Sequence, residues 1–293
     1  MSSTVQDTTH RDEDPVRRHG RRRTRAPLSL AVEARRQVGR LRTRWTFGIL
    51  LALPLIVVGA FALGDGGEQG GQRFSDLATL GAGNFAIFML LVSAPLLLLI
   101  VGALFVGDPV PSEASWSSLR YLLTAPVPRA RLLTSKLLVG LLLTAAAMTL
   151  LLAWVLVVGA VFYGWESLNL RAGGVLDWPQ TLSRLGIGAG YIFISQLPFA
   201  AVAFWMGVRT DAPLAAVGVA VLSSIVSSIL DSLDALGDYR RALPNHYAFE
   251  WVGIFAQDAD YAALLPGVLW ASLYFTVFVA LAYRHFGRKD ILS

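Results

Sequence analysis

The residue types that carry most enzyme chemistry are scarce in the apolar parts of this 293-residue chain. Cysteine is absent, which excludes disulfides, thiolate metal sites and thiol nucleophiles. The long apolar stretches contain no His, Asp, Glu, Lys or Arg in their interiors. An enzyme acting there would need a nucleophile with a base, or a metal cluster. We therefore expect no catalytic residue and no metal site, and we predict that the chain is not an enzyme.

The polar residues that remain inside the apolar stretches could line a pathway or support helix packing. The candidates are Gln196, Ser223, Ser224, Ser227 and Ser228. Serines four residues apart share one face of a helix, as do Gly186 and Gly190. Small residues on one face let transmembrane helices approach closely, so packing is favoured over substrate contact.

The most informative polar segment runs from Asp108 to Lys136. Pro109 and Pro111 should end the preceding apolar stretch, and Ser112 can cap a short helix. Apolar residues then recur at helical spacing, at Trp116, Leu119, Leu122 and Leu123. Such a helix can dock into a groove of a partner protein, or it can lie flat against lipid. The basic residues that follow, Arg129, Arg131 and Lys136, are expected to anchor the chain at the membrane surface.

The elements that must position these residues are membrane-spanning helices. The chain is 55% hydrophobic and 15% charged, with a mean hydropathy of +0.56, which is typical of a membrane protein. A spanning helix needs roughly 20 largely apolar residues. Six segments qualify, at about 45–63, 85–106, 137–163, 185–208, 212–230 and 262–283. The predicted fold class is an all-α integral membrane protein with six transmembrane helices, kinked at Pro54, Pro95 and Pro198.

The basic residues predict which side each connection occupies. With the N-terminus inside, segments 1–44, 107–136, 209–211 and 284–293 hold 20 Lys and Arg against 9 acidic residues. The opposite connections hold 5 against 11. Because Lys and Arg are retained on the cytoplasmic side, we predict that both termini are cytoplasmic and that the protein is a multi-pass protein of the cell (plasma or inner) membrane.

The flanking segments are predicted from composition. Residues 1–27 should be a disordered basic arm, and residues 284–293 a cytoplasmic tail. Residues 28–44 alternate apolar residues with arginines and predict an amphipathic helix lying at the lipid interface, with a solvated basic stretch as the alternative. Residues 45–283 form the transmembrane domain, with the cytoplasmic segment 108–136 and an outer helical segment 231–261.

The outer segment 231–261 is rich in aromatic residues. Asn245 can cap a helix whose apolar face includes Tyr247, Trp251 and Phe255. These aromatics could gate an exit, or they could only anchor the segment at the membrane interface. His246 among them is expected to be an interfacial residue rather than a proton switch or a metal ligand.

A family resemblance is carried by residues 113–136. An acidic residue is followed by Leu-Arg, two leucines, Pro-Val-x-Arg, two more leucines and a lysine, at Glu113, Leu119, Arg120, Leu122, Leu123, Pro126, Val127, Arg129, Leu132, Leu133 and Lys136. This pattern resembles the signature of type 2 ATP-binding-cassette transporter permeases. Ser117 and Ser118 stand where that family commonly has Gly-Thr. The six-span layout and the basic helix before the first span are also similar to that family.

The resemblance implies a coupling helix that docks on a separate ATPase subunit, with Glu113, Trp116, Leu119, Arg120, Leu122 and Leu123 as the coupling residues. It also implies a second permease subunit, identical or homologous. The near absence of charge in the spans favours a hydrophobic or amphipathic cargo. No Gly-x-x-x-x-Gly-Lys-Ser/Thr motif occurs in the chain, so ATP and Mg²⁺ would be bound by the partner chain and no cofactor by this one. Membrane lipid is an expected contact, and nucleic acid is not. The alternatives are a secondary transporter and a non-transporting membrane scaffold.

Overall fold

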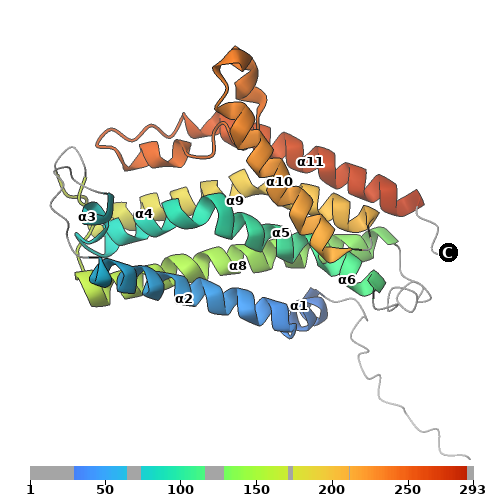
Figure 1. Cartoon of the computed structure of the whole chain (residues 1–293), viewed down its shortest axis with the longest axis horizontal. Coiled ribbons are helices and arrows are strands. Elements are labelled where there is room, and N and C mark those ends of the chain that lie inside the picture. The colour runs from blue at the N-terminus through green and yellow to red at the C-terminus, as the bar shows by residue number, and fades with distance from the viewer. Residues whose placement is uncertain (1–29, 65–73, 116–128, 171–173, 211, 289–293) are drawn as a thin grey trace, which may run out of the picture.

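The computed structural model describes residues 30–64, 74–115, 129–170, 174–210 and 212–288, and within them the protein is a bundle of helices (Figure 1). Six helical segments are long and apolar enough to cross a membrane: Leu41–Leu63, Ala82–Gly107, Ala130–Tyr163, Trp178–Arg209, Pro213–Asp231 and Leu264–Arg288. Each overlaps one of the six predicted spans. The predicted fold class of an all-α protein with six membrane-spanning helices is confirmed.

The helices in chain order are α1 (Leu30–Val38), α2 (Leu41–Leu63), α3 (Phe74–Ala78), α4 (Ala82–Ser93), the π-helical turn η1 (Ala94–Leu98), α5 (Leu99–Gly107), α6 (Pro109–Ser115), α8 (Arg129–Tyr163), α9 (Trp178–Arg209), α10 (Pro213–Asp231), the 3₁₀ segments η2 (Asp234–Ala242) and η3 (Glu250–Phe255), and α11 (Leu264–Arg288). An isolated antiparallel bridge joins Asn169 and Val175. The described part of α1 and the last turn of α11 lie at the same end of the bundle, with α3 at the other (Figure 1).

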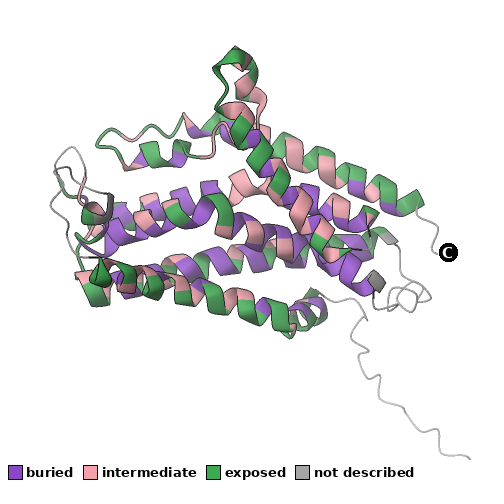
Figure 2. Cartoon of the chain, in the orientation of Figure 1, coloured by how far each residue is buried: buried purple, intermediate pink, exposed green. Residues whose placement is uncertain are grey.

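The core lies where α4, α5, α8 and α9 pack together, and the buried residues concentrate on these helices (Figure 2). Large apolar residues of α2, α10 and α11 are exposed, for example Ile56, Leu222 and Leu269. A water-soluble protein rarely leaves so much contiguous apolar surface uncovered, whereas a membrane protein presents it to lipid or to another subunit. The distribution of burial therefore agrees with the membrane-spanning assignment.

Two glycines let the central helices cross closely. A Cβ added at Gly140 of α8 would come within 2.6 Å of the Phe105 carbonyl oxygen of α5. A Cβ at Gly207 of α9 would collide with the Gly107 carbonyl oxygen at the end of α5. By contrast, a Cβ at Gly186 or Gly190 would meet no described atom within 4 Å. Close approach of the described helices therefore depends on Gly140 and Gly207, and not on Gly186 and Gly190, the pair with the small-x-x-x-small spacing.

The prolines within the spans behave differently from one another. Pro54 and Pro198 lie inside continuous helices, α2 and α9. Pro95 lies in η1, so the second span is an α-helix interrupted by one π-helical turn. A π-helical turn displaces the hydrogen-bonding register and is often found at functional sites. The predicted kink at Pro95 corresponds to this change of helix type.

Two boundaries differ from those predicted. The helix expected over residues 28–44 ends at Val38, and residues from Leu41 onward already belong to the spanning helix α2. Pro109 and Pro111 do not precede a helix capped by Ser112 but form the first turn of α6. Proline is well tolerated in a first turn, because its missing N–H would have no partner inside the helix there. Asp108, which precedes α6, accepts a hydrogen bond from the Ser112 hydroxyl at 2.7 Å.

Candidate functional site

A cluster of buried charges joins three helices at the end of the bundle that holds α1 and α6. Glu113 of α6 is completely buried, and Lys136 of α8 is 1% exposed. The Lys136 Nζ lies 2.5 Å from Glu113 Oε2 and 3.3 Å from Oε1 of Glu33 in α1. Isolated buried charges are strongly unfavourable, so this geometry, in which Lys136 meets two carboxylates, is what allows all three to be buried. We call these three residues, together with the arginines and the aspartate described next, the ionic cluster.

Arginines at the α1–α2 junction complete the ionic cluster. Arg36 Nη1 lies 2.9 Å from Glu113 Oε1. Arg40 lies 3.2 Å from Asp108 Oδ2 and 3.8 Å from Glu113 Oε1, and Arg42 lies 2.6 Å from Asp108 Oδ1. The start of the connection after α5 is therefore tied by ion pairs to the segment that precedes the first span.

Two residues of the ionic cluster, Glu113 and Lys136, lie in a different environment from the one predicted from the sequence. Glu113 was expected on a coupling surface and Lys136 at the membrane surface, but both side chains are buried against each other. The reason is mutual neutralisation, since each is the nearest opposite charge of the other. Arg131 is exposed, as a surface anchor should be. Of the remaining coupling residues, Trp116, Leu119, Arg120, Leu122 and Leu123 lie outside the described residues, as does the side chain of Arg129.

The sequence-predicted serines bind the outer segment. The Asn245 side chain donates to the Ser224 carbonyl oxygen at 2.8 Å, to Ser224 Oγ at 3.0 Å and to Ser228 Oγ at 2.7 Å. The Asn245 backbone N–H donates to Ser227 Oγ at 3.2 Å. Ser223 Oγ donates instead to the Ala220 carbonyl oxygen of its own helix. Asn245, which was expected to cap a helix, therefore joins the outer segment to α10.

A polar cavity of about 230 Å³ lies between η1, α9, α10 and residues 245–249. Its walls include Gln196, Asp231 and His246. Gln196 Nε2 donates to the Ala94 carbonyl oxygen of η1 at 2.8 Å. His246 Nδ1 lies 2.6 Å from Asp231 Oδ1, so the histidine is paired with a carboxylate rather than being only interfacial. Sequence reasoning missed this pair, because Asp231 marks the end of a span and its partner follows fifteen residues later.

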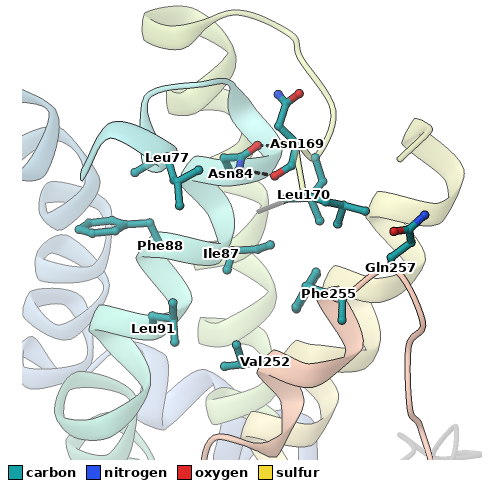
Figure 3. Close-up of a pocket in the computed structure, with 13 residues that line it drawn as sticks. Leu77, Asn84, Ile87, Phe88, Leu91, Asn169, Leu170, Val252, Phe255 and Gln257 are labelled. Atoms are coloured by element: carbon teal, nitrogen blue, oxygen red, sulfur yellow. Dashed lines mark hydrogen bonds between the residues drawn. The ribbon is translucent and has the colours of Figure 1, made fainter. Parts of the chain in front are cut away.

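A second, apolar pocket of about 300 Å³ lies at the α3 end of the bundle (Figure 3). Leu77, Phe88 and Leu91 line one side, and Val252 and Phe255 of η3 line the other. Asn84 closes one edge, donating to the Asn169 carbonyl oxygen at 3.0 Å and accepting from the Asn169 N–H at 2.9 Å. Most of the lining is apolar, and the Asn84 side chain is already hydrogen-bonded to Asn169, so the pocket favours apolar groups.

The candidate gate residues belong to the wall between the outer segment and α9. Trp251 is completely buried, and its ring lies against Gly188 of α9. The Tyr247 carbonyl oxygen accepts a 2.7 Å hydrogen bond from the Tyr191 hydroxyl. Phe255 is half-buried at the apolar pocket. Arg184 fixes η3 by donating to the carbonyl oxygens of Ile254 and Ala256 at 2.9 and 2.7 Å.

Comparison with known proteins decides the family. The family model described as a protein of unknown function, DUF2705, matches residues 70–292, which is most of the chain. The chain belongs to the DUF2705 family. None of the curated proteins is similar enough to the chain to match it.

The part of the chain shared with DUF2705 contains the residues that line both cavities and three of the seven residues of the ionic cluster, Asp108, Glu113 and Lys136. Glu113, Lys136, Gln196 and Asp231 lie inside the matched range, whereas α1 and α2 lie before it. This DUF2705 protein is therefore a membrane protein of six candidate spans, and its described residues form a polar cavity and an apolar pocket. Within the described residues, no group of three or more His, Asp or Glu side chains is placed to hold a metal ion.

Proposed function

We propose that this DUF2705 chain is the transmembrane permease subunit of an ATP-binding-cassette transporter, an exporter of a hydrophobic or amphipathic compound driven by a separate ATPase subunit. The observation that carries the proposal is the ionic cluster. Residues 113–136 resemble the coupling segment of type 2 permeases, and the two ends of that segment, Glu113 and Lys136, are bonded to each other and to α1.

This arrangement suits the transmission of force. A partner that pushes on residues 116–128 would displace α6 and the start of α8 together, because Glu113 and Lys136 join them. Through Glu33 and Arg36 the same displacement would reach α1. Rigid elements joined by ion pairs carry coupling between distant sites when they move as a unit between two arrangements.

The proposal needs partners. The chain lacks a phosphate-binding motif, so ATP and Mg²⁺ would be held by the ATPase subunit. That subunit would lie in the cytoplasm, the side on which the excess of Lys and Arg predicts both termini. The exposed apolar faces of α2, α10 and α11 offer surface for lipid and for a second permease subunit. In this proposal the chain itself is a transport subunit and not an enzyme.

The test is ATP hydrolysis by the purified complex. The tagged chain, extracted from its own membrane in mild detergent, should co-purify with an ATPase subunit. Replacing Leu119 and Leu122 together by alanine should remove most of that subunit and of its ATP turnover, since a few buried apolar anchors carry most interface energy. The matched control is alanine at Leu142 and Leu150, which are exposed apolar residues of α8 and lie outside the faces offered to a second subunit. Absence of an ATPase subunit, or equal effects of the two double variants, would contradict the proposal.

Secondary transport is the second candidate, and one observation favours it. Ion-coupled transporters commonly place an ionisable group at an irregular helix within the membrane. Here the π-helical turn η1 and Asp231 border the same cavity. Uptake or efflux by proteoliposomes that contain this chain alone, driven by an ion gradient without ATP, would favour this candidate. A scaffold without transport would show neither activity.

A further inference from the structure

The polar cavity contains hydrogen-bond acceptors that the protein does not use. The Oε1 atom of Gln196 is buried and accepts no hydrogen bond from any described residue. Ser195 donates its hydroxyl hydrogen to the Ile192 carbonyl oxygen at 2.8 Å, which leaves the Ser195 oxygen as an acceptor on the cavity wall. A buried acceptor without a donor costs stability, so a ligand that supplies N–H groups would satisfy it.

The donors of the cavity, by contrast, are largely occupied. The Asn245 amide group is bonded to Ser224 and Ser228. The amide group of Gln196 is bonded to Ala94. His246 Nδ1, facing a carboxylate that can only accept, donates to Asp231 Oδ1. A ligand such as a carboxylate or a phosphate would meet the Ser224 and Ser228 hydroxyls as donors, but no Lys or Arg among the described lining residues, and it would be repelled by the Asp231 carboxylate.

The cavity wall contains one carboxylate, that of Asp231, and no Lys or Arg side chain among the described residues that line it. Oδ1 of Asp231 faces His246, and among the described residues no donor is bonded to Oδ2. An arginine, Arg240, does contact Asp231, but its Nη1 donates to the main-chain oxygen at 3.3 Å and not to the carboxylate. The same guanidinium also lies 3.1 Å from Asp234 Oδ1, so its charge is already balanced. The Asp231 carboxylate is left to attract a cation.

The remaining wall of the cavity is apolar, formed by Pro95, Leu99 and Phe249 among others. The volume, about 230 Å³, lies just below the roughly 300–1,000 Å³ of pockets for drug-sized ligands. The ligand must therefore be small and must have one polar and one apolar end.

The geometry points to a binding site for a small amphipathic amine, whose ammonium group bonds Asp231 and Gln196 while its apolar part lies against Pro95, Leu99 and Phe249. As a statement about cargo, the inference rests on the proposed transport function and specifies its substrate class. A primary ammonium fits better than a quaternary one, because only N–H groups can donate to Gln196 Oε1.

The test measures binding to the purified full-length chain in lipid nanodiscs, without an ATPase subunit. Phenylbutylamine is the probe, and phenylbutanol and phenylbutyrate are controls with the same apolar part and a neutral or an anionic end. Equilibrium dialysis with empty nanodiscs subtracts partition into lipid. We expect saturable binding of the amine, at least about tenfold weaker binding of the alcohol, and no saturable binding of the carboxylate.

Three variants locate the site. Asp231→Asn keeps the acceptor for His246 but removes the charge, and should weaken amine binding at least about tenfold. Gln196→Met should weaken it about fivefold, because one hydrogen bond is lost. Asp238→Asn is the matched control, since it removes an equal charge from a carboxylate that is 87% exposed, lies outside the cavity and pairs with Arg241 rather than Arg240, and it should change the affinity less than about twofold.

The inference is overturned if wild-type protein does not bind the amine saturably, if the amine and the alcohol bind equally, or if Asp231→Asn and Asp238→Asn have the same effect on amine binding. Each variant must elute and unfold thermally like the wild type. If Asp231→Asn does not, Asp231→Glu, which keeps the charge, should retain binding while Gln196→Met weakens it about fivefold. Because no ATPase subunit is present, binding of the amine can succeed while stimulated ATP hydrolysis fails, so the two proposals are tested separately.

Discussion

At the residue scale, Glu113 and Lys136 are among the most deeply buried charges in the described part of the chain. A buried ion pair stabilises little compared with an apolar pair of the same shape, but removing one partner leaves an uncompensated charge. Glu113 faces three cations, since Arg36, Arg40 and Lys136 all lie within 4 Å of it. Loss of its charge would therefore leave several like charges close together.

We predict that Glu113→Gln lowers the free energy of unfolding by about 3–5 kcal/mol, since a buried charge loses its partner. Arg36→Gln is the control, because Arg36 is 40% exposed and should cost at most about 1 kcal/mol. The measurement is the thermal or denaturant midpoint of the purified variants in the same detergent. Equal midpoints for the two variants would show that Glu113 is not the centre of the cluster.

The sequence shows both charges at the ends of a loop but not their pairing. Lys136 immediately precedes an apolar stretch, a position typical of a surface anchor, and only the fold brings it against Glu33, which is 103 residues away. Asp231 and His246 were missed for the same reason, since each looks like an ordinary loop residue next to a span. Pairing of this kind is decided by tertiary packing, which hydropathy and residue spacing do not describe.

At the element scale, the six spans could be predicted because long apolar runs without charge have one structural solution in lipid, the helix. The π-helical turn η1 could be predicted only as a kink at Pro95, because its register depends on what packs beside it, including Gln196. The outer segment was expected to contain a helix capped by Asn245. It consists of turns and short 3₁₀ segments, since Asn245 bonds α10 instead.

The bonds of Asn245 predict how the outer segment is held. Asn245→Ala removes three side-chain hydrogen bonds to α10, at a cost of about 1–3 kcal/mol. The locally opened state of the outer segment should be populated more often, so amide hydrogen exchange across residues 245–255 should accelerate at least about fivefold. Ser223→Ala is the control, because Ser223 bonds only its own helix and should leave exchange in the outer segment unchanged. Unchanged exchange in Asn245→Ala would mean that other contacts hold the segment.

At the scale of the whole molecule, the bundle has one end that contains α1, α6, the ionic cluster and the last turn of α11, and an opposite end that contains α3 and the apolar pocket (Figure 1). The apolar pocket and the ionic cluster therefore lie at opposite ends of the bundle. In the proposed mechanism, ATP-driven movement enters at the charged end and changes the shape of the cavities. The excess of Lys and Arg predicts that the charged end faces the cytosol.

The most direct test of the central proposal is to determine on which side of the membrane residues 108–136 lie. A cytosolic ATPase can bind this segment only if the segment faces the cytosol. The chain has no cysteine, so a single introduced cysteine reports its own position. With a membrane-impermeant maleimide on intact cells, Asp258→Cys in the exposed outer segment should be labelled, and Leu119→Cys should be labelled only after the membrane is permeabilised. Labelling of Leu119→Cys in intact cells, with Asp258→Cys protected, would contradict the account.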